Sequence, residues 1–324
     1  MRRLSVSMWG SLALCLQFGV LLLALSSQPV QASDLNLELR QAALLGDLEE
    51  VDRLLASGAD PSSKTKFGKS ALMFAVEDGN DEVAHRLIER GADVNAKSVA
   101  GCSALTFAAE GGYNELASTL LEKGATTQIK TRAGWDAMMI ATRYNHLDVM
   151  TTLIAHGANI NTSDKDGMTA LMTAADKGHF EATEMLLKAG ADTFVRNRDG
   201  ATTLIVAASK GRLPIVRLLL QHGVNVQAMS DDGSTALLWA AGAGHANTLE
   251  LLLKFGAEID HQNTDGSTAL IEGVLIGDEN VVAMLLKHGA KVSLQDSTGK
   301  RAMYYAQTAG LSAVVRMLKQ AVSE

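Results

Sequence analysis

Few residue combinations in this sequence could perform catalysis. Phe67-Gly68-Lys69-Ser70 resembles the end of a phosphate-binding loop, in which backbone N–H groups and a lysine hold phosphate oxygens. The first glycine of such a loop belongs at position 63, which is Ser63. The patterns H-E-x-x-H, C-x-x-C and G-x-S-x-G do not occur in the chain. We therefore predict that the protein is not an enzyme and takes no cofactor or small-molecule substrate.

Histidines and methionines invite a metal-binding interpretation. The histidines include two sets at related positions: His146, His179 and His245; His156, His222 and His288. Members of a set are separated by one or two lengths of a constant interval, so they belong to different helix pairs. Packed helices lie about 8–10 Å apart, whereas metal ligands converge on one ion at about 2 Å. We expect these to be surface histidines and predict no metal site.

The methionines have an equally ordinary interpretation. Five of them fall at positions that we expect to be buried in short helices: Met73, Met138, Met139, Met172 and Met303. Methionine commonly fills gaps in a protein core, which we favour over copper binding. Cys102 is the only cysteine after residue 32, so a processed chain cannot form an internal disulfide. We interpret it as a small tolerated side chain, with a redox-active thiol as the alternative.

Repetition at a fixed period indicates which elements must position any site. Eight glycines recur at one constant interval: Gly58, Gly91, Gly124, Gly157, Gly190, Gly223, Gly256 and Gly289. Nine leucines keep the same interval: Leu54, Leu87, Leu120, Leu153, Leu186, Leu219, Leu252, Leu285 and Leu318. A third series is Gly46, Gly79, Gly112, Asn145, Gly178, Gly211, Gly244, Gly277 and Gly310. Such a period predicts a stack of repeats rather than two globular domains.

Each position of the repeat has a physical explanation. Good N-cap residues precede short apolar segments: Ser70, Ser103, Asp136, Thr169, Thr202, Thr235 and Thr268. We expect a buried first helix from each N-cap to the third-series glycine. An amphipathic second helix, such as the one beginning near Glu181, then ends at the first-series glycine. About ten turn-rich residues follow, as in residues 159–167, and suit a protruding hairpin.

These features resemble the ankyrin repeat, with its D-G-x-T-x-L, A-A-x-x-G-H and L-L-x-x-G-A-D-x-N pattern. The match is clearest at Asp166-Gly167-Met168-Thr169-Ala170-Leu171 and at Gly91-Ala92-Asp93-Val94-Asn95. The copies lie near residues 34–66, 67–99, 100–132, 133–165, 166–198, 199–231, 232–264, 265–297 and 298–324. The Pro and His of the family's Thr-Pro-Leu-His are missing from all copies, which removes one polar network between repeats. The resemblance implies an all-α solenoid of about nine helix-turn-helix repeats with protruding β-hairpin fingers.

Residues 1–32 have the pattern of a secretory signal. Arg2 and Arg3 precede an apolar run over residues 12–25, and Val30-Gln31-Ala32 fits a small-residue cleavage site. We predict cleavage after Ala32, a repeat domain over residues 33–324, and a periplasmic or secreted protein. The alternative is an uncleaved anchor, because residues 4–25 are just long enough to span a bilayer.

The charge balance bears on the class of partner. Loss of Arg2 and Arg3 lowers the basic count from 29 to 27 against 36 acidic residues, which changes the formal charge from −7 to −9. This balance disfavours nucleic acid and anionic lipid as partners. It leaves a protein partner, and the cations described next would suit one with an acidic surface.

The resemblance also implies that the fingers and the first helices line a concave binding groove. We predict that partner binding centres on Arg132, Trp135, Arg143, Tyr144, Lys165, Lys177, Arg196, Arg198 and Lys210. Trp, Tyr and Arg are the residues enriched at binding hot spots. The other interpretation is a solvated charged rim with Trp135 packed on its neighbour. The groove is mixed in charge near Lys66, Lys69 and Glu77, and acidic near Asp231, Asp232 and Asp265.

The sequence thus predicts a monomeric, non-catalytic scaffold outside the cytoplasm that binds a protein partner in its groove. A structural role, through self-association or attachment to the cell envelope by the acidic C-terminal repeats, is the alternative. An enzyme with an unrecognised site is a remote alternative.

Overall fold

The computed structural model describes residues 32–323. The predicted basic start and apolar run, with most of the cleavage site, lie outside the described residues. Ala32, at the predicted cleavage point, is the first residue of the first helix. Within residues 32–323, no helix is both long enough and apolar enough to cross a membrane.

The described residues form eighteen α-helices that pair in chain order. Their bounds are α1 (Ala32–Leu45), α2 (Leu48–Ala56), α3 (Ala71–Glu77), α4 (Asp81–Glu89), α5 (Ala104–Gly111), α6 (Asn114–Glu122), α7 (Ala137–Tyr144), α8 (Leu147–Ala155), α9 (Ala170–Lys177), α10 (Phe180–Lys188), α11 (Thr203–Ser209), α12 (Leu213–Gln221), α13 (Ala236–Gly242), α14 (Ala246–Lys254), α15 (Ala269–Ile276), α16 (Glu279–Lys287), α17 (Ala302–Thr308) and α18 (Ser312–Ser323).

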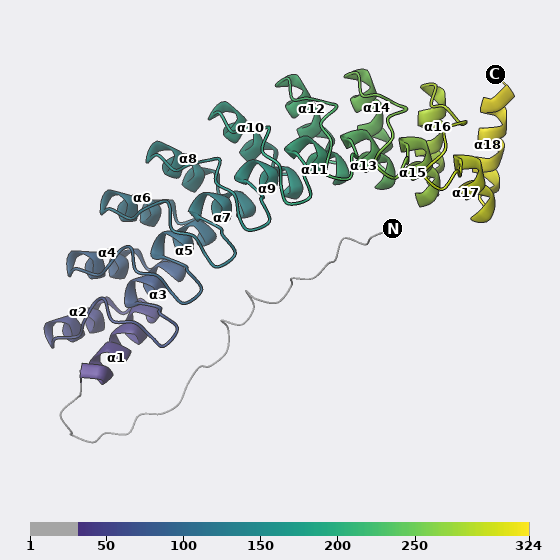
Figure 1. Ribbon diagram of the computed structural model, residues 1–324. Helices are drawn as coiled ribbons and strands as arrows, with labels where there is room; N and C mark the ends of the chain where they lie inside the picture. The colour runs from purple at the N-terminus through teal and green to yellow at the C-terminus, as the bar shows by residue number, and fades with distance from the viewer. Residues whose placement is uncertain (1–31, 324) are drawn as a thin grey trace.

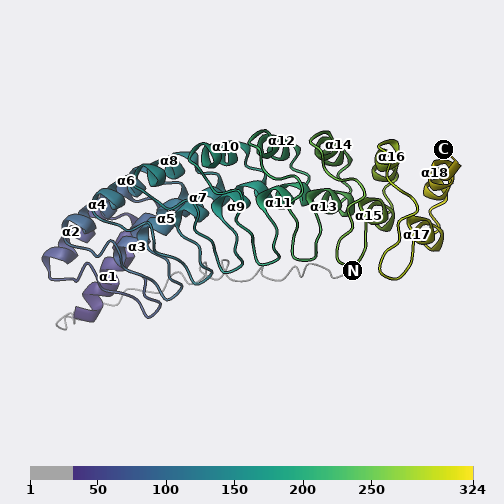
Figure 2. The same ribbon diagram turned by 45° about the horizontal axis from the view of Figure 1, so that its top comes forward.

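The helix pairs stack into a curved solenoid of two layers. Odd-numbered helices lie on the concave side and even-numbered helices on the convex side (Figure 1). The loops that lead from one pair to the next project beyond the odd-numbered helices as a row of parallel fingers (Figure 2). The concave face is therefore built from the fingers and the first helix of each pair.

The β-hairpins that the resemblance implied for the fingers are not confirmed. Residues 32–323 contain no named strand, and the finger loops show isolated bridges instead: Lys64 with Ser70, Ser163 with Thr169 and Met229 with Thr235. In each bridge the second residue directly precedes a first helix, so that helix begins before a strand can extend.

The repeating leucines form the centre of the core, as predicted. All nine, from Leu54 to Leu318, are 0% exposed. Buried residues form two clusters, and the neighbouring α9 residues Ala174 and Ala175 belong to one cluster each. The core therefore runs through the stack without a domain break, as expected of repeats that bury their apolar faces on each other.

The predicted caps explain where most first helices begin and end. The hydroxyl of Ser70 accepts from the backbone N–H of Met73 at 3.3 Å, and the carboxylate of Asp136 accepts from that of Met139 at 3.0 Å. Asn145 ends α7 with φ of 60°, the left-handed conformation that its glycine counterparts adopt. Thr202 and Thr235 have the extended backbone of a cap, but their buried hydroxyls make no hydrogen bond. At these two positions the side chain therefore does not cap the helix.

The histidines that directly follow the third-series residues Asn145, Gly178 and Gly244 are not the surface residues that we expected. His146, His179 and His245 are half-buried, and each Nε2 lies 3.0–3.3 Å from a backbone carbonyl in the preceding helix pair. Asn80 and Arg212 occupy the same position of the repeat and donate to the preceding pair in the same way. The carbonyls at a helix C-terminus lack intrahelical partners, and these side chains supply one. A polar network therefore does join the repeats, at a different position from the family's Thr-Pro-Leu-His.

Candidate protein-binding groove

Seven of the eight finger loops in residues 32–323 are held in shape by a side chain at one repeat position, and the exception is the sixth, where Ser230 donates to the Ser234 carbonyl. Asp164 Oδ1 accepts from the backbone N–H groups of Asp166 and Met168, both at 2.9 Å. Thr65, Ser98, Thr131, Asn197, Asn263 and Asp296 occupy the same position of the repeat and accept in the same manner. Because Asx and Ser/Thr side chains mimic a backbone turn, this position fixes the loop without a strand.

Successive fingers are also joined by backbone hydrogen bonds. The N–H of Val99 donates to the carbonyl of Phe67 at 2.8 Å, and that of Arg132 to Ala100 at 2.8 Å. The series continues with Lys165 to Ala133, Arg198 to Asp166, Asp231 to Asp199, Thr264 to Asp232 and Ser297 to Asp265. The fingers thus form one continuous edge that presents side chains at a regular pitch.

The structure places the predicted site residues in two rows. Arg132, Lys165, Arg196 and Arg198 are exposed on the fingers. Arg143, Tyr144, Lys177 and Lys210 lie at the C-terminal ends of α7, α9 and α11. Only Arg143 reaches across to the finger row, where its guanidinium lies 4.8 Å from the centre of the Trp135 ring.

Trp135 is not the exposed finger residue that we expected. Its side chain is half-buried against the core, and its Nε1 donates to Asp164 Oδ2 of the next finger at 2.9 Å. Arg143 covers one face of the ring, a favourable cation–π contact. The interpretation of a tryptophan packed on its neighbour fits this geometry better, so Trp135 mainly fixes the spacing of two fingers.

Tyr144 offers more surface than Trp135. It is 43% exposed, its hydroxyl lies 3.3 Å from a carboxylate oxygen of Glu110, and its ring stacks on His146 at 6.1 Å. Burial, assisted by the nearby Glu110 carboxylate, raises the pKa of the Tyr144 hydroxyl. The hydroxyl therefore remains a neutral donor on the groove wall.

Several predicted cations are neutralised within the protein. Arg196 pairs with Asp231 at 3.1 Å, and Arg198 pairs with Asp166 at 3.0 Å. Asp176 pairs with Lys177 at 3.1 Å and Lys210 at 3.4 Å. Burial would raise the pKa of Asp176, but hydrogen bonds and charge from these two lysines outweigh it and lower the pKa. Arg132 and Lys165 form no ion pair with any residue in the described part of the chain.

Sequence reasoning missed the cations of the first three fingers as a group. Lys64, Lys97 and Lys130 share the repeat position of Arg196, and Lys66 shares that of Arg132 and Lys165. All are exposed, and Phe67 beside them is 64% exposed. Comparing one repeat position across all copies would have found this row. Grouping residues by region instead hid it within a groove described as mixed.

Lys69, the lysine of the phosphate-loop-like segment, contacts other side chains of the protein. Its side chain is 15% exposed and forms an ion pair with Glu77. Its Nζ also lies 4.5 Å from the Phe74 ring centre and 4.9 Å from that of Phe107. These contacts leave Lys69 poorly placed to hold a phosphate.

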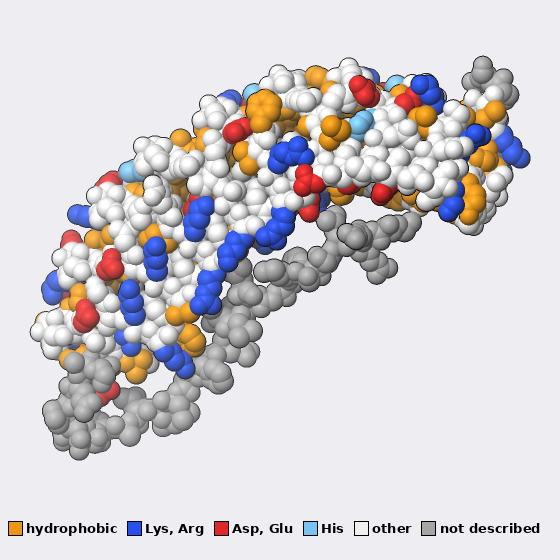
Figure 3. Space-filling view, in the orientation of Figure 1, with side chains coloured by type: hydrophobic (Ala, Val, Ile, Leu, Met, Phe, Trp, Pro, Cys, Tyr) orange, Lys and Arg blue, Asp and Glu red, His pale blue; other side chains and the backbone are white. Residues whose placement is uncertain are grey.

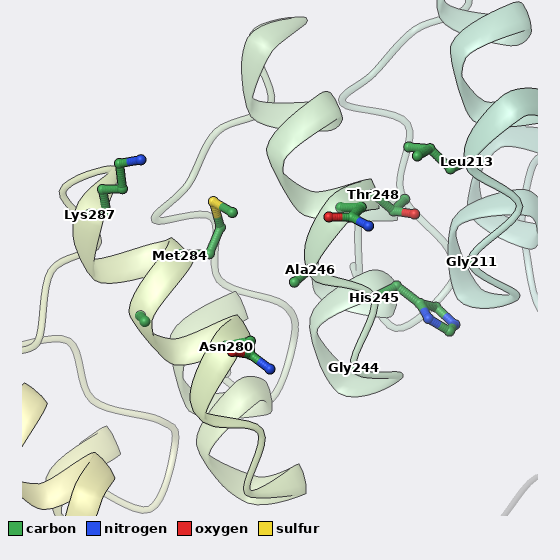
Figure 4. A pocket seen from close by; sticks show the side chains of 11 residues that line it. Gly211, Leu213, Gly244, His245, Ala246, Thr248, Asn280, Met284 and Lys287 are labelled. Atoms are coloured by element: carbon green, nitrogen blue, oxygen red, sulfur yellow. The ribbon is translucent and has the colours of Figure 1, made fainter.

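A depression of about 640 Å³ lies on the convex side, between α12, α14 and α16 (Figure 4). The His245 side chain lies near Gly211, and Met284 lies on α16 (Figure 4). His245 is already engaged with the Ser209 carbonyl, and Lys287 is exposed on the rim. The other polar side chains that line it are Asn247, Thr248 and Asn280, which are uncharged. In residues 32–323, no three His, Cys, Asp or Glu side chains are placed to hold a metal ion.

Comparison with known proteins agrees with the repeat geometry. A family model for ankyrin repeats (three copies) matches residues 39–131, 126–197, 189–263 and 252–323. None of the curated proteins resembles this chain closely enough to count as a relative.

Proposed function

Because the chain belongs to the ankyrin-repeat family, whose members are generally protein–protein interaction modules and typically not enzymes, we propose that it is a non-catalytic scaffold for a protein partner. In this proposal, residues 1–32 direct export and are removed, and residues 33–324 act as about nine repeats in the periplasm or the medium. The partner binds on the concave face of a monomer.

One observation carries the choice of face. Finger-to-finger hydrogen bonds order the concave edge, yet Arg132 and Lys165 on that edge are exposed and form no ion pair within residues 32–323. Ordered cations without internal partners are what an electrostatically complementary interface presents to its ligand. On the convex side, Lys188 and Lys254 pair with acids four residues earlier, and the cations without an ion pair within residues 32–323, such as Lys123 and Lys287, lie in widely separated repeats rather than in a row.

Capture from envelope extract tests this proposal. The double variant Arg132→Glu/Lys165→Glu should lose most of the partner that the unaltered protein retains, as quantified by mass spectrometry. A matched control, Lys123→Glu/Lys287→Glu, changes two exposed cations that belong to the convex helix layer and should retain it. Equal retention by both variants would show that the partner does not use the concave edge. Light scattering that shows a dimer without extract would favour the self-associating alternative.

A further inference from the structure

At one end of the concave edge, the first three fingers carry positive charge only. Six exposed cations line the first four fingers and are called here the basic finger edge: Lys64, Lys66, Lys97, Lys130, Arg132 and Lys165. Residues 61–69, 94–102 and 127–135, which form the first three fingers, include no Asp or Glu. Figure 3 shows Lys and Arg side chains gathered along this edge, with Asp and Glu appearing beside it farther along the chain.

The six cations are largely available to a ligand. None forms an ion pair with any residue in the described range 32–323. Lys130 donates to the Ser163 carbonyl at 2.9 Å, and Lys66 lies 5.0 Å from the Phe67 ring centre. These contacts orient two of the side chains without cancelling their charge.

Two exposed apolar side chains lie beside the basic finger edge. Phe67 is 64% exposed and Val99, on the next finger, is 49% exposed. The backbone hydrogen bond from Val99 to Phe67 ties these two residues together. An apolar side chain of a ligand could be desolvated here, which would add affinity to the electrostatic attraction.

The charge changes sign toward the C-terminal fingers. Asp231 and Asp232 occupy the sixth finger and Asp260 and Asp265 the seventh, with no Lys or Arg in residues 226–234 or 259–267. An anionic ligand is therefore attracted to the first three fingers and repelled by the sixth and seventh, while the eighth finger again carries cations, Lys300 and Arg301. A broad polyanion such as duplex nucleic acid or a membrane surface would meet the acidic fingers as well as the basic ones, and the acidic net charge opposes it.

We propose that the basic finger edge binds an extended acidic segment of the partner, lying across the first four fingers with an apolar residue against Phe67 and Val99. This inference rests on the proposed function and specifies the chemistry of its ligand. An extended chain advances about 3.3 Å per residue, and neighbouring repeats are about 8–10 Å apart. Every third ligand residue therefore meets the next finger, so the recognised segment has acidic residues at about that spacing.

A designed peptide tests the charge and the spacing together. The probe is a fluorescein-labelled peptide of about twelve residues with Glu at every third position, Ser and Thr between, and Leu at each end. A second peptide has the same composition with its glutamates contiguous. Fluorescence anisotropy at low ionic strength should show the spaced peptide binding about fivefold more tightly, with affinity falling as salt rises.

Variants locate the binding surface. Lys64→Glu/Lys97→Glu/Arg132→Glu should weaken binding of the spaced peptide about tenfold or more, because attraction becomes repulsion at three successive fingers. Lys123→Glu/Arg217→Glu/Lys287→Glu makes the same change in net charge at exposed residues of the convex layer and should change affinity less than twofold. Phe67→Ser should weaken binding about threefold, since the backbone bond to Val99 does not involve the side chain.

Three results would overturn the inference: equal losses in the two triple variants, equal affinity for the two peptides, or tighter binding of a single-stranded oligonucleotide of equal charge. The proposed function can survive such a result. If envelope extract yields a partner that the Lys64→Glu/Lys97→Glu/Arg132→Glu protein still captures, the scaffold function stands and the acidic-segment inference fails.

Discussion

At the scale of the residue, the sequence predicted the types of side chain on the concave face better than their roles. The repeat pattern places Trp135 in an exposed finger, but Asp164 and Arg143 of neighbouring elements enclose it. Both contacts depend on how the finger packs against α7 and the next finger, which the order of residue types along the chain does not reveal. The half-burial of His146 and His179 escaped prediction for the same reason.

Trp135→Ala should lower the free energy of unfolding by about 1–3 kcal/mol, because it removes half-buried aromatic area and the hydrogen bond to Asp164. Urea denaturation measures this loss. Trp135→Phe keeps most of the ring contact and should cost about half as much. If Trp135→Ala unfolds at the same urea concentration as the unaltered protein, the tryptophan is not part of the finger framework.

Asp296 should make the free energy of unfolding depend on pH in the acidic range. Burial would raise its pKa, but the hydroxyls of Tyr305 and Thr298 and the backbone N–H groups of Lys300 and Thr298 outweigh it and lower the pKa to about 2. A carboxyl with a depressed folded-state pKa stabilises the protein fully above its unfolded value of about 3.9, and this stabilisation is lost as pH falls toward 2.

The urea midpoint of Asp296→Asn should therefore fall less between pH 5 and pH 2 than that of the unaltered protein. Asn occupies the equivalent position at Asn197 and Asn263, so the variant should fold normally. Parallel pH profiles for the two proteins would exclude Asp296 as a source of acid sensitivity.

At the scale of the element, the sequence predicted most of what the structure shows. Leucines and closing glycines at one strict period determine where helices begin, end and bury their apolar faces. The finger conformation was less predictable, since a polar loop of this length suits either a hairpin or a turn closed by one side chain. The conformation depends on a single side chain such as that of Asp164. In the sequence, this residue is a common turn former and does not distinguish the two conformations.

Leu186→Ala should lower the free energy of unfolding by about 2–5 kcal/mol, the usual result of truncating a fully buried leucine. Leu186 lies at 0% exposure in α10, between repeats on both sides. Lys188→Ala in the same helix is the control and should change stability by less than about 0.5 kcal/mol. Similar effects of the two substitutions would show that the buried face of α10 has been misassigned.

At the scale of the whole molecule, contacts between neighbouring pairs dominate, so stability need not be uniform along the stack. The side chains that reach back to the preceding pair end at His245. At the next two copies, Asp278 instead caps α16, and Leu311 has no polar group to donate. The sequence shows that these two copies have different residues at this position. The effect of the difference could be predicted only after the structure showed the hydrogen bonds that the earlier copies make.

Hydrogen exchange should therefore be faster in α15–α18 than in α7–α12, because the C-terminal pairs lack these bonds and have a neighbour on only one side at the end. Mass spectrometry of peptides from the native protein measures the difference. Uniform protection across the stack would mean that the reach-back bonds contribute little and that the array opens as one unit.

The finger-to-finger hydrogen bonds also have a consequence for how such a protein can change its length. Each bond joins positions that recur once per repeat, for example Val99 to Phe67 and then Arg132 to Ala100. Duplicating or losing one whole unit therefore regenerates a donor and an acceptor at the new junction, whereas any other insertion separates them. In evolution, whole fingers can therefore be added to or removed from the concave edge one at a time. The order of charges along the edge then changes while the backbone geometry stays the same.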